Sequence, residues 1–153
     1  MSAVPDFEDM LTLLDRHGVR YLIVGGLAFI YHAKPRYTKD IDLWLAADDE
    51  NVERANRALT DFGSPSLLDP GQDEQILQIG VEPNRIDLLR RLGGVMFDTA
   101  WERRIRSTYG SAPANWIHLE DLLMIKEAID LPRHQDDARV LREILRRNRG
   151  GAG

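Results

Sequence analysis

The chain has 153 residues, of which 43% are hydrophobic and 29% charged, with a formal net charge of −5 and no cysteine. This composition is typical of a folded globular domain, and the lack of cysteine excludes disulfides, thiolate nucleophiles and zinc–cysteine sites. The acidic balance argues against a generally basic nucleic-acid binder, and no apolar run approaches the roughly 20 residues of a membrane span.

Residues 1–153 are expected to form one domain, because the chain is long enough for a substantial core and contains no linker or internal repeat. Residues 149–153 are expected to form a flexible tail. The N-terminus lacks the basic-then-apolar pattern of a signal peptide, so we expect a cytoplasmic protein with no membrane partner.

The first half of the chain predicts helices that alternate with short strands. Amphipathic spacing marks the helices, β-branched apolar runs mark the strands, and Gly or Pro residues mark the breaks. We expect a helix over 5–17, a strand over 19–24, a short helix over 27–33, a strand over 40–46 and a helix over 48–62.

The second half is less regular until its last third. We expect strands within 75–81 and 84–92, a short helix and then a strand within 94–110, a helix over 118–130 and, after Pro132, a final helix over roughly 134–148. This order indicates an α/β or α+β fold in which helices pack against a sheet.

Asp40 and Asp42 occupy alternate positions of a predicted strand, so their side chains share one face of the sheet. Two such carboxylates repel each other unless a cation or a proton compensates. Either both are exposed charges at a solvated strand end, or they bind a divalent cation. Oxygen ligands favour Mg²⁺ or Mn²⁺ in the second case.

A third carboxylate, Asp87, strengthens the interpretation as a metal site. It lies between Ile86 and Leu88 in an apolar strand, where burying an uncompensated charge is costly. If this strand lies beside 40–46, the three carboxylates converge and can hold two metal ions about 3.5–4 Å apart, as in phosphoryl transfer.

Gly25 and Gly26 separate a predicted strand from the helix that follows. Backbone N–H groups at such a junction can face an anion, and the missing Cβ atoms let phosphate oxygens come close. A Gly-Gly pair alone is more often a plain turn, but beside two aspartates it indicates a phosphate cradle that faces a metal site.

Three motifs together resemble the polymerase-β-like nucleotidyltransferases, in particular the small stand-alone members of that superfamily. The first is Gly25-Gly26, a spacer of thirteen residues and Asp40-Ile41-Asp42. The second is "PNRIDLL" followed by "GVMF", which looks like the region of the third aspartate. The third is "EDLLMIKEAIDLPRHQDDARVL", which is similar to a C-terminal helix pair with a lysine and an Arg-x-x-Asp element, matched by Lys126, Arg133 and Asp136.

The resemblance implies a nucleotidyltransferase fold: a small mixed β-sheet with helices packed against it and a C-terminal helix pair. It implies that Asp40, Asp42 and Asp87 are the catalytic and metal-binding residues, holding two Mg²⁺ or Mn²⁺ ions with a bound NTP. It also implies that Asp87 helps to deprotonate the acceptor and that Gly25 and Gly26 contact the triphosphate. Gly26 departs from many relatives, which have a serine there.

Several other polar residues have two interpretations each. Arg36, Thr38 and Lys39 precede Asp40 and either reach a phosphate or the acceptor, or are solvated loop residues. Lys126 either contacts the triphosphate or extends its charge to the surface. Arg133 and Asp136 are spaced for a salt bridge across one helical turn.

The histidines and the C-terminal arginines carry weaker signals. The histidines have no spacing typical of metal ligands or catalytic triads, so we interpret them as incidental: His17, His32, His118 and His134. The arginines either complement the dipole of the last helix or hold a phosphate-bearing partner: Arg139, Arg142, Arg146, Arg147 and Arg149.

The leading functional hypothesis is a Mg²⁺-dependent nucleotidyltransferase. It would transfer a nucleoside monophosphate from an NTP, expected to be ATP, to a hydroxyl of an RNA (tRNA-like) or protein acceptor. Because the family includes toxin and antitoxin components, a toxin–antitoxin role with a cognate partner is part of this hypothesis. The alternative is a non-catalytic regulatory or antitoxin-like binding partner that keeps the fold. A third interpretation is a plain α/β domain with solvated acidic residues.

Overall fold

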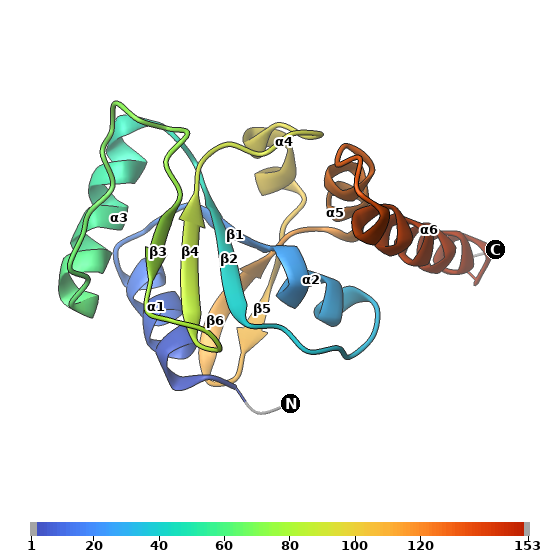
Figure 1. The fold of residues 1–153 in the computed structure, drawn as a ribbon, viewed down its shortest axis with the longest axis horizontal. Coiled ribbons are helices and arrows are strands. Elements are labelled where there is room, and N and C mark those ends of the chain that lie inside the picture. The colour runs from blue at the N-terminus through green and yellow to red at the C-terminus, as the bar shows by residue number, and fades with distance from the viewer. Residues whose placement is uncertain (1–2, 152–153) are drawn as a thin grey trace.

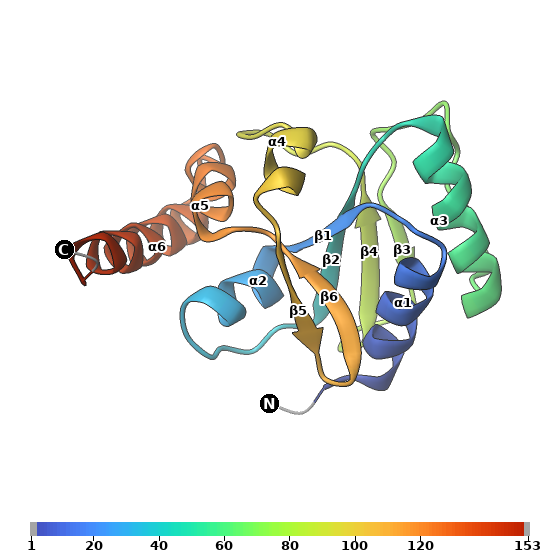
Figure 2. The ribbon, with the colours of Figure 1, turned by 180° about the vertical axis from the view of Figure 1, so that it is seen from behind.

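Residues 3–151, which a computed structural model describes, form six helices and one six-stranded sheet (Figure 1, Figure 2). The elements in chain order are α1 (Pro5–Arg16), β1 (Tyr21–Val24), α2 (Gly25–His32), β2 (Asp40–Leu45), α3 (Asp49–Phe62), β3 (Leu77–Ile79), β4 (Arg85–Leu89), α4 (Phe97–Glu102), β5 (Ile105–Tyr109), β6 (Ala112–Trp116), α5 (Leu119–Glu127) and α6 (Pro132–Gly151).

The sheet is mixed, with the strand order β3-β4-β2-β1-β6-β5. β2 pairs in parallel with β4 and antiparallel with β1, and β1 pairs in parallel with β6. The hairpins β3–β4 and β5–β6 are antiparallel and form the two edges. The expected mixed sheet with helices packed against it is therefore confirmed, and β2 and β4 lie side by side near its middle.

The helix ends follow from local chemistry. Pro5 is in the first turn of α1, where its missing N–H costs no intrahelical bond. The Asp48 carboxylate accepts a hydrogen bond of 3.1 Å from the Asn51 N–H and caps α3. Gly63 ends that helix in the left-handed conformation, with φ of +91°.

Two helix boundaries differ from the sequence predictions, and one strand was not predicted. α2 begins at Gly25, so both glycines belong to its first turn. α6 begins at Pro132 itself, because proline is compatible with a first helical position. β6 was not predicted, since the first four residues of its sequence, Ala-Pro-Ala-Asn-Trp, are poor strand formers. α1 packs across this strand, and the small Ala112 and Ala114 are fully buried there.

The sheet separates an apolar face from a face that carries carboxylates. Ile41, Leu43 and Leu45 on β2 are fully buried, as is Leu88 on β4, and they belong to a hydrophobic cluster to which α1 and α3 also contribute. Asp40 and Asp42 alternate with these residues and so project from the other face. The register of the core thereby also fixes the register of the aspartates.

α5 and α6 pack against each other, which confirms the expected C-terminal helix pair, and α6 extends to the end of the molecule opposite α3 (Figure 1, Figure 2). α6 runs to Gly151, past residue 149 where we expected the tail to begin, and residues 152–153 lie outside the described part of the chain. Within residues 3–151, no helix combines the length and the apolar character needed to cross a bilayer.

The five arginines in the last three turns of α6 and just before them are paired within the molecule. Arg139 pairs with Asp136, Arg142 with Glu127, Arg146 and Arg147 with Glu143, and Arg149 with Glu120. Such exposed pairs contribute little to stability, but they balance the charge of the helix. The interpretation as a solvated, charge-balanced surface is thus favoured over an open basic patch.

Candidate functional site

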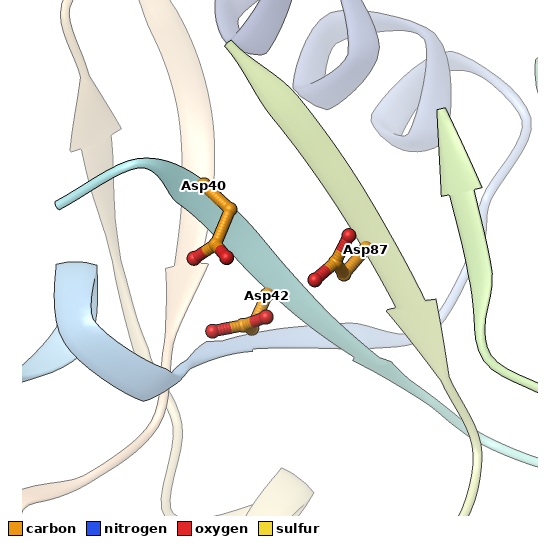
Figure 3. Close-up of side chains that lie close together, drawn as sticks. All are labelled: Asp40, Asp42 and Asp87. Carbon is orange, nitrogen blue, oxygen red and sulfur yellow. The ribbon is translucent and has the colours of Figure 1, made fainter. Parts of the chain in front are cut away.

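The parallel pairing of β2 and β4 brings the three aspartates together. Asp40 lies opposite Arg85, and Asp42 lies opposite Asp87. Carboxylate oxygens of Asp40, Asp42 and Asp87 all lie within 4.8 Å of one another, and Figure 3 shows the three side chains on the same side of the two strands. The convergence that the strand pattern predicted is present.

Arg85 lies among these carboxylates and was not identified from the sequence. Its Nη2 donates to Asp40 Oδ2 at 2.9 Å, and its Nε donates to Asp87 Oδ1, also at 2.9 Å. A signal existed: Arg85 is two residues before Asp87, and alternate strand residues share a face. Arg85 bridges two of the three carboxylates and holds them at a fixed spacing.

The three carboxylates are wholly or partly buried, and two of them oppose ionisation. Asp87 is only 6% exposed, and Asp40 and Asp42 are half-buried. This burial contradicts the interpretation of these aspartates as exposed, solvated charges. Burial, followed by the charges of Asp40 and Asp87, raises the pKa of Asp42 to about 7 from its ordinary 3.8. Burial and then the charge of Asp87 also raise the pKa of Asp40, although Arg85 opposes this rise.

Gly25 lies directly against the Asp42 carboxylate. Val24 is the register partner of Asp42 across β1 and β2, so the next residue meets the aspartate side chain. A Cβ atom at position 25 would lie 2.1 Å from Asp42 Oδ2, and the φ of Gly25 is +68°. Both the space and the backbone conformation therefore require glycine here.

Of the three polar residues expected near the glycines, Thr38 lies beside them, whereas Lys39 and Arg36 pair with acidic residues. A Cβ at Gly26 would lie 3.1 Å from Thr38 Oγ1, so Thr38 is next to the first turn of α2, where N–H groups lack intrahelical acceptors. Lys39 instead lies 3.5 Å from Glu82 Oε2 at the surface. Arg36 points to α6, where it pairs with Asp137.

A cavity of about 250 Å³ opens beside the carboxylates. It lies next to Gly25, Asp42 and Asp87 on one side and next to Lys126 and His134 on the other. Its remaining lining is mostly apolar: Val24, Ile76, Gln78, Leu89, Leu92, Leu122, Ile125 and Ile129. Lys126 is 4% exposed and pairs with Asp137 at 2.9 Å, so it is a buried lysine and does not extend to the surface.

One expectation for the C-terminal helices was wrong, and one residue without an expected role lies at the cavity. Asp136 pairs with Arg139 at the surface and not with Arg133, and the buried acidic residue is its neighbour Asp137. His134, which we interpreted as incidental, lines the cavity within 3.2 Å of the Lys126 ammonium. The remaining histidines, His17, His32 and His118, do not line this cavity.

The three carboxylates fit a hard divalent cation. The set offers only oxygen ligands, which Mg²⁺ and Mn²⁺ prefer, and three negative charges face the single positive charge of Arg85. Burial first, and then this incomplete compensation, raise the pKa of both Asp40 and Asp42. A cation at this position would relieve the repulsion that Arg85 relieves only in part.

We expect Asp42→Asn to stabilise the metal-free protein much more at pH 8 than at pH 4.5. Folded Asp42 keeps its proton up to about pH 7, whereas the unfolded chain releases it near 3.8. The folded state therefore binds more protons between these values, and its stability falls as pH rises through this window. The variant escapes this loss, which we put at about 1–3 kcal/mol for a half-buried carboxyl.

Thermal melts at the two pH values measure this effect. Asp98→Asn, which alters a carboxylate that is 85% exposed, is the control and should behave like the wild type. Saturating Mn²⁺ should raise the melting temperature of the wild type far more than that of Asp42→Asn. An Asn variant that gains equally at both pH values would contradict the assignment.

No model of a known protein family matches the chain, and no curated protein matches it in sequence. Solved structures, however, are similar to it. The lincosamide antibiotic adenylyltransferase LnuA with lincomycin bound has a TM-score of 0.60 and 16% identity, covering 94% of this chain and 99% of that one.

Two further structures agree with the first. ANT(2")-Ia in complex with adenylyl-2"-tobramycin has a TM-score of 0.57 and 14% identity, covering 91% of this chain and 87% of that one. An antigenic nucleotidyltransferase-like protein from Paracoccidioides brasiliensis has a TM-score of 0.54 and 14% identity, covering 94% and 78%. At these identities the likeness is one of fold.

Proposed function

Because this chain has the nucleotidyltransferase fold, we propose that it transfers a nucleoside monophosphate from an NTP to a hydroxyl group of an acceptor. The observation that carries the proposal is the convergence of Asp40, Asp42 and Asp87 within 4.8 Å beside a helix that begins with two glycines. One side of the site can hold cations, and the adjacent side can hold the phosphates that accompany them.

In this proposal Asp40, Asp42 and Asp87 hold Mg²⁺ or Mn²⁺, two ions when an NTP is bound, and these would neutralise charge on the phosphates. The acceptor oxygen attacks the α-phosphorus, and the bond from that phosphorus to the oxygen bridging to the β-phosphate breaks. Pyrophosphate leaves, and the acceptor proton passes to a carboxylate oxygen of Asp87. Arg85 keeps Asp87 in place through its two hydrogen bonds to that carboxylate.

The phosphates are assigned to the start of α2 and its surroundings. Unpaired N–H groups of Gly25 and Gly26 would donate to phosphate oxygens, and the Thr38 hydroxyl next to Gly26 would replace the serine that many relatives carry. Lys126 would contact the triphosphate from the far side of the cavity. Lys39 can also contact a phosphate when its ammonium leaves Glu82, because an exposed ion pair of this kind is weak.

For the acceptor we propose a hydroxyl of an RNA (tRNA-like) or of a protein, with ATP as the donor. We place this reaction in the cytoplasm and propose that the protein works with a cognate toxin or antitoxin partner. The cavity favours a second candidate, a small hydroxylated molecule with an apolar part. The lining of this cavity is mainly Leu and Ile apart from its charged residues, and five arginines of α6 are paired within the molecule. Two of the similar structures contain lincomycin or an adenylylated tobramycin.

Labelled NTPs test the proposal. The protein is incubated with a cell extract, Mg²⁺ or Mn²⁺, and each NTP labelled at the α-phosphate or, in parallel, at the γ-phosphate. We expect transfer of the α-label only, and its complete loss on removal of the metal with EDTA. Sensitivity of the product to nuclease or protease, or resistance to both, identifies an RNA, a protein or a small acceptor. Absence of α-label transfer with every NTP would contradict the proposal.

The alternative, a regulatory binding partner without turnover, makes a different prediction. Such a protein would bind its partner without nucleotide or metal, and Asp40→Ala would leave that binding intact. Calorimetry with and without Mg²⁺ and NTP separates the two functions. The burial of Asp87 favours catalysis, because three converging carboxylates that only Arg85 compensates are costly to keep without a cation.

A further inference from the structure

A buried group of charged side chains lies across the cavity from the aspartates. It joins Lys126 of α5, His134 and Asp137 of α6, and Arg36 of the loop between α2 and β2. The side chains of Lys126 and Asp137 are only 5% and 8% exposed. Burying ionised side chains is costly and requires partners, so the presence of this cluster indicates a role beyond packing.

Asp137 holds two cations at once. Its carboxylate accepts two hydrogen bonds from the Arg36 guanidinium, at 2.8 and 3.1 Å, and pairs with the Lys126 ammonium at 2.9 Å. Burial alone would raise the pKa of Asp137, but the bonds from Arg36 and Lys126 outweigh it and lower the pKa. Two positive charges thus face one negative charge, and an uncompensated positive charge remains at the cavity.

The Lys126 ammonium also determines the tautomer of His134. The two nitrogens, Lys126 Nζ and His134 Nδ1, are 3.2 Å apart. An ammonium can only donate, so Nδ1 must accept, and the neutral ring then carries its proton on Nε2. Burial and the charge of Lys126 both lower the pKa of His134, which favours this neutral ring. His134 therefore keeps a free N–H donor in the lining of the cavity.

The cavity consequently has opposite charges on its two sides. Asp42 and Asp87 belong to the sheet, Lys126 and His134 belong to the C-terminal helix pair, and leucine and isoleucine side chains make up most of the remaining lining. A ligand that fits this arrangement carries cations at one end and anionic oxygens at the other. A metal-bound polyphosphate has that distribution of charge.

We propose that Asp137 is a positioning residue that holds Lys126 toward the cavity, and that Lys126 and His134 together bind the terminal phosphates of the NTP and the departing pyrophosphate. This inference rests on the proposed function and adds two residues to it. Because Arg36 shares the same carboxylate, Asp137 also ties the loop that carries Thr38 to the C-terminal helix pair.

Binding of inorganic tripolyphosphate in EDTA tests the subsite without metal, acceptor or turnover. We expect the dissociation constant to rise about tenfold or more in Asp137→Asn, since a charge-assisted contact is lost. A purely electrostatic role predicts the reverse, because removal of a negative charge should tighten anion binding. Unchanged or tighter binding in Asp137→Asn would overturn the proposal.

Matched variants separate positioning from general damage. Asp136→Asn changes the adjacent, exposed carboxylate that pairs with Arg139 and should bind like the wild type. His134→Gln keeps an N–H donor and should retain most of the affinity that His134→Phe loses. If Asp137→Asn does not fold, Lys126→Met keeps the apolar stem without the charge and should show the same loss; retained affinity there would refute the subsite.

Two further readouts distinguish this proposal from the one on which it rests. Long-range ¹H–¹⁵N spectra should show His134 protonated at Nε2, with a shift on addition of tripolyphosphate; protonation at Nδ1 would refute the assigned donor. In transfer assays Asp137→Asn should raise the KM for the NTP by a larger factor than it lowers kcat. If the wild type binds tripolyphosphate but transfers nothing, only the proposed function fails; if Asp137→Asn keeps the wild-type KM, only this inference fails.

Discussion

Asp42→Asn is expected to lower the rate of nucleotidyl transfer by about 10³-fold or more while leaving the protein folded and, above pH 7, more stable than the wild type. The amide is isosteric with the carboxyl but carries no charge to hold a cation. It also removes the buried charge whose desolvation, followed by repulsion from Asp40 and Asp87, raises the pKa of Asp42 to about 7. Activity and stability should therefore change in opposite directions.

Single-turnover transfer of the α-labelled phosphate, measured beside a thermal melt on the same samples, checks this result. Asp98→Asn, remote from the cavity and highly exposed, should leave both quantities unchanged. Transfer within about tenfold of the wild type would show that Asp42 does not hold a catalytic cation. Loss of both activity and folding would show instead that the carboxylate is structural.

Gly25→Ala is expected to abolish detectable transfer and to destabilise the protein by about 1–3 kcal/mol. The new methyl group would lie 2.1 Å from Asp42 Oδ2 and 2.9 Å from its Cγ, so the carboxylate must leave its position. The φ of +68° adds backbone strain for any residue with a Cβ. Transfer assays and denaturant unfolding measure the two effects.

Two other glycines provide matched controls for this prediction. Gly63 has φ of +91° and open space around it, so Gly63→Ala reports backbone strain alone and should cost about 1 kcal/mol with full activity. A Cβ at Gly26 would meet only side-chain atoms, the nearest being Thr38 Oγ1 at 3.1 Å, so Gly26→Ala should reduce transfer modestly. Equal activity losses at positions 25 and 63 would show that the clash with Asp42 is irrelevant.

The main elements and the three aspartates were predictable because their signals are local. Alternation on a strand places Asp40 and Asp42 on one face whatever the rest of the fold does. An aspartate between Ile86 and Leu88 stands out for the same reason. β6 escaped prediction because Ala112 and Ala114 are selected by the close approach of α1, a constraint that the strand sequence does not express.

The helical side of the site could not be predicted for a geometric reason. Whether Asp136 or Asp137 faces inward depends on the rotation of α6 about its axis, and one residue changes that direction by about 100°. The partner that decides it, Arg36, is about a hundred residues away in the chain. The position of His134 in the site likewise depends on α5, which brings Lys126 beside it. Arg85 was closer to prediction, since its strand position already aligned it with Asp87.

The pairing of Asp42 with Asp87 has a consequence for how the chain reaches its native state. If β4 slipped by one residue along β2, Asp87 would turn toward the apolar face that holds Ile41 and Leu43, and Ile86 and Leu88 would leave it. Such a misfolded form would bury a charge and expose two large hydrocarbons, so it cannot compete with the native one. A stable core therefore requires the same strand register that aligns the aspartates. Molecules that fold should carry an assembled cluster without any separate maturation step.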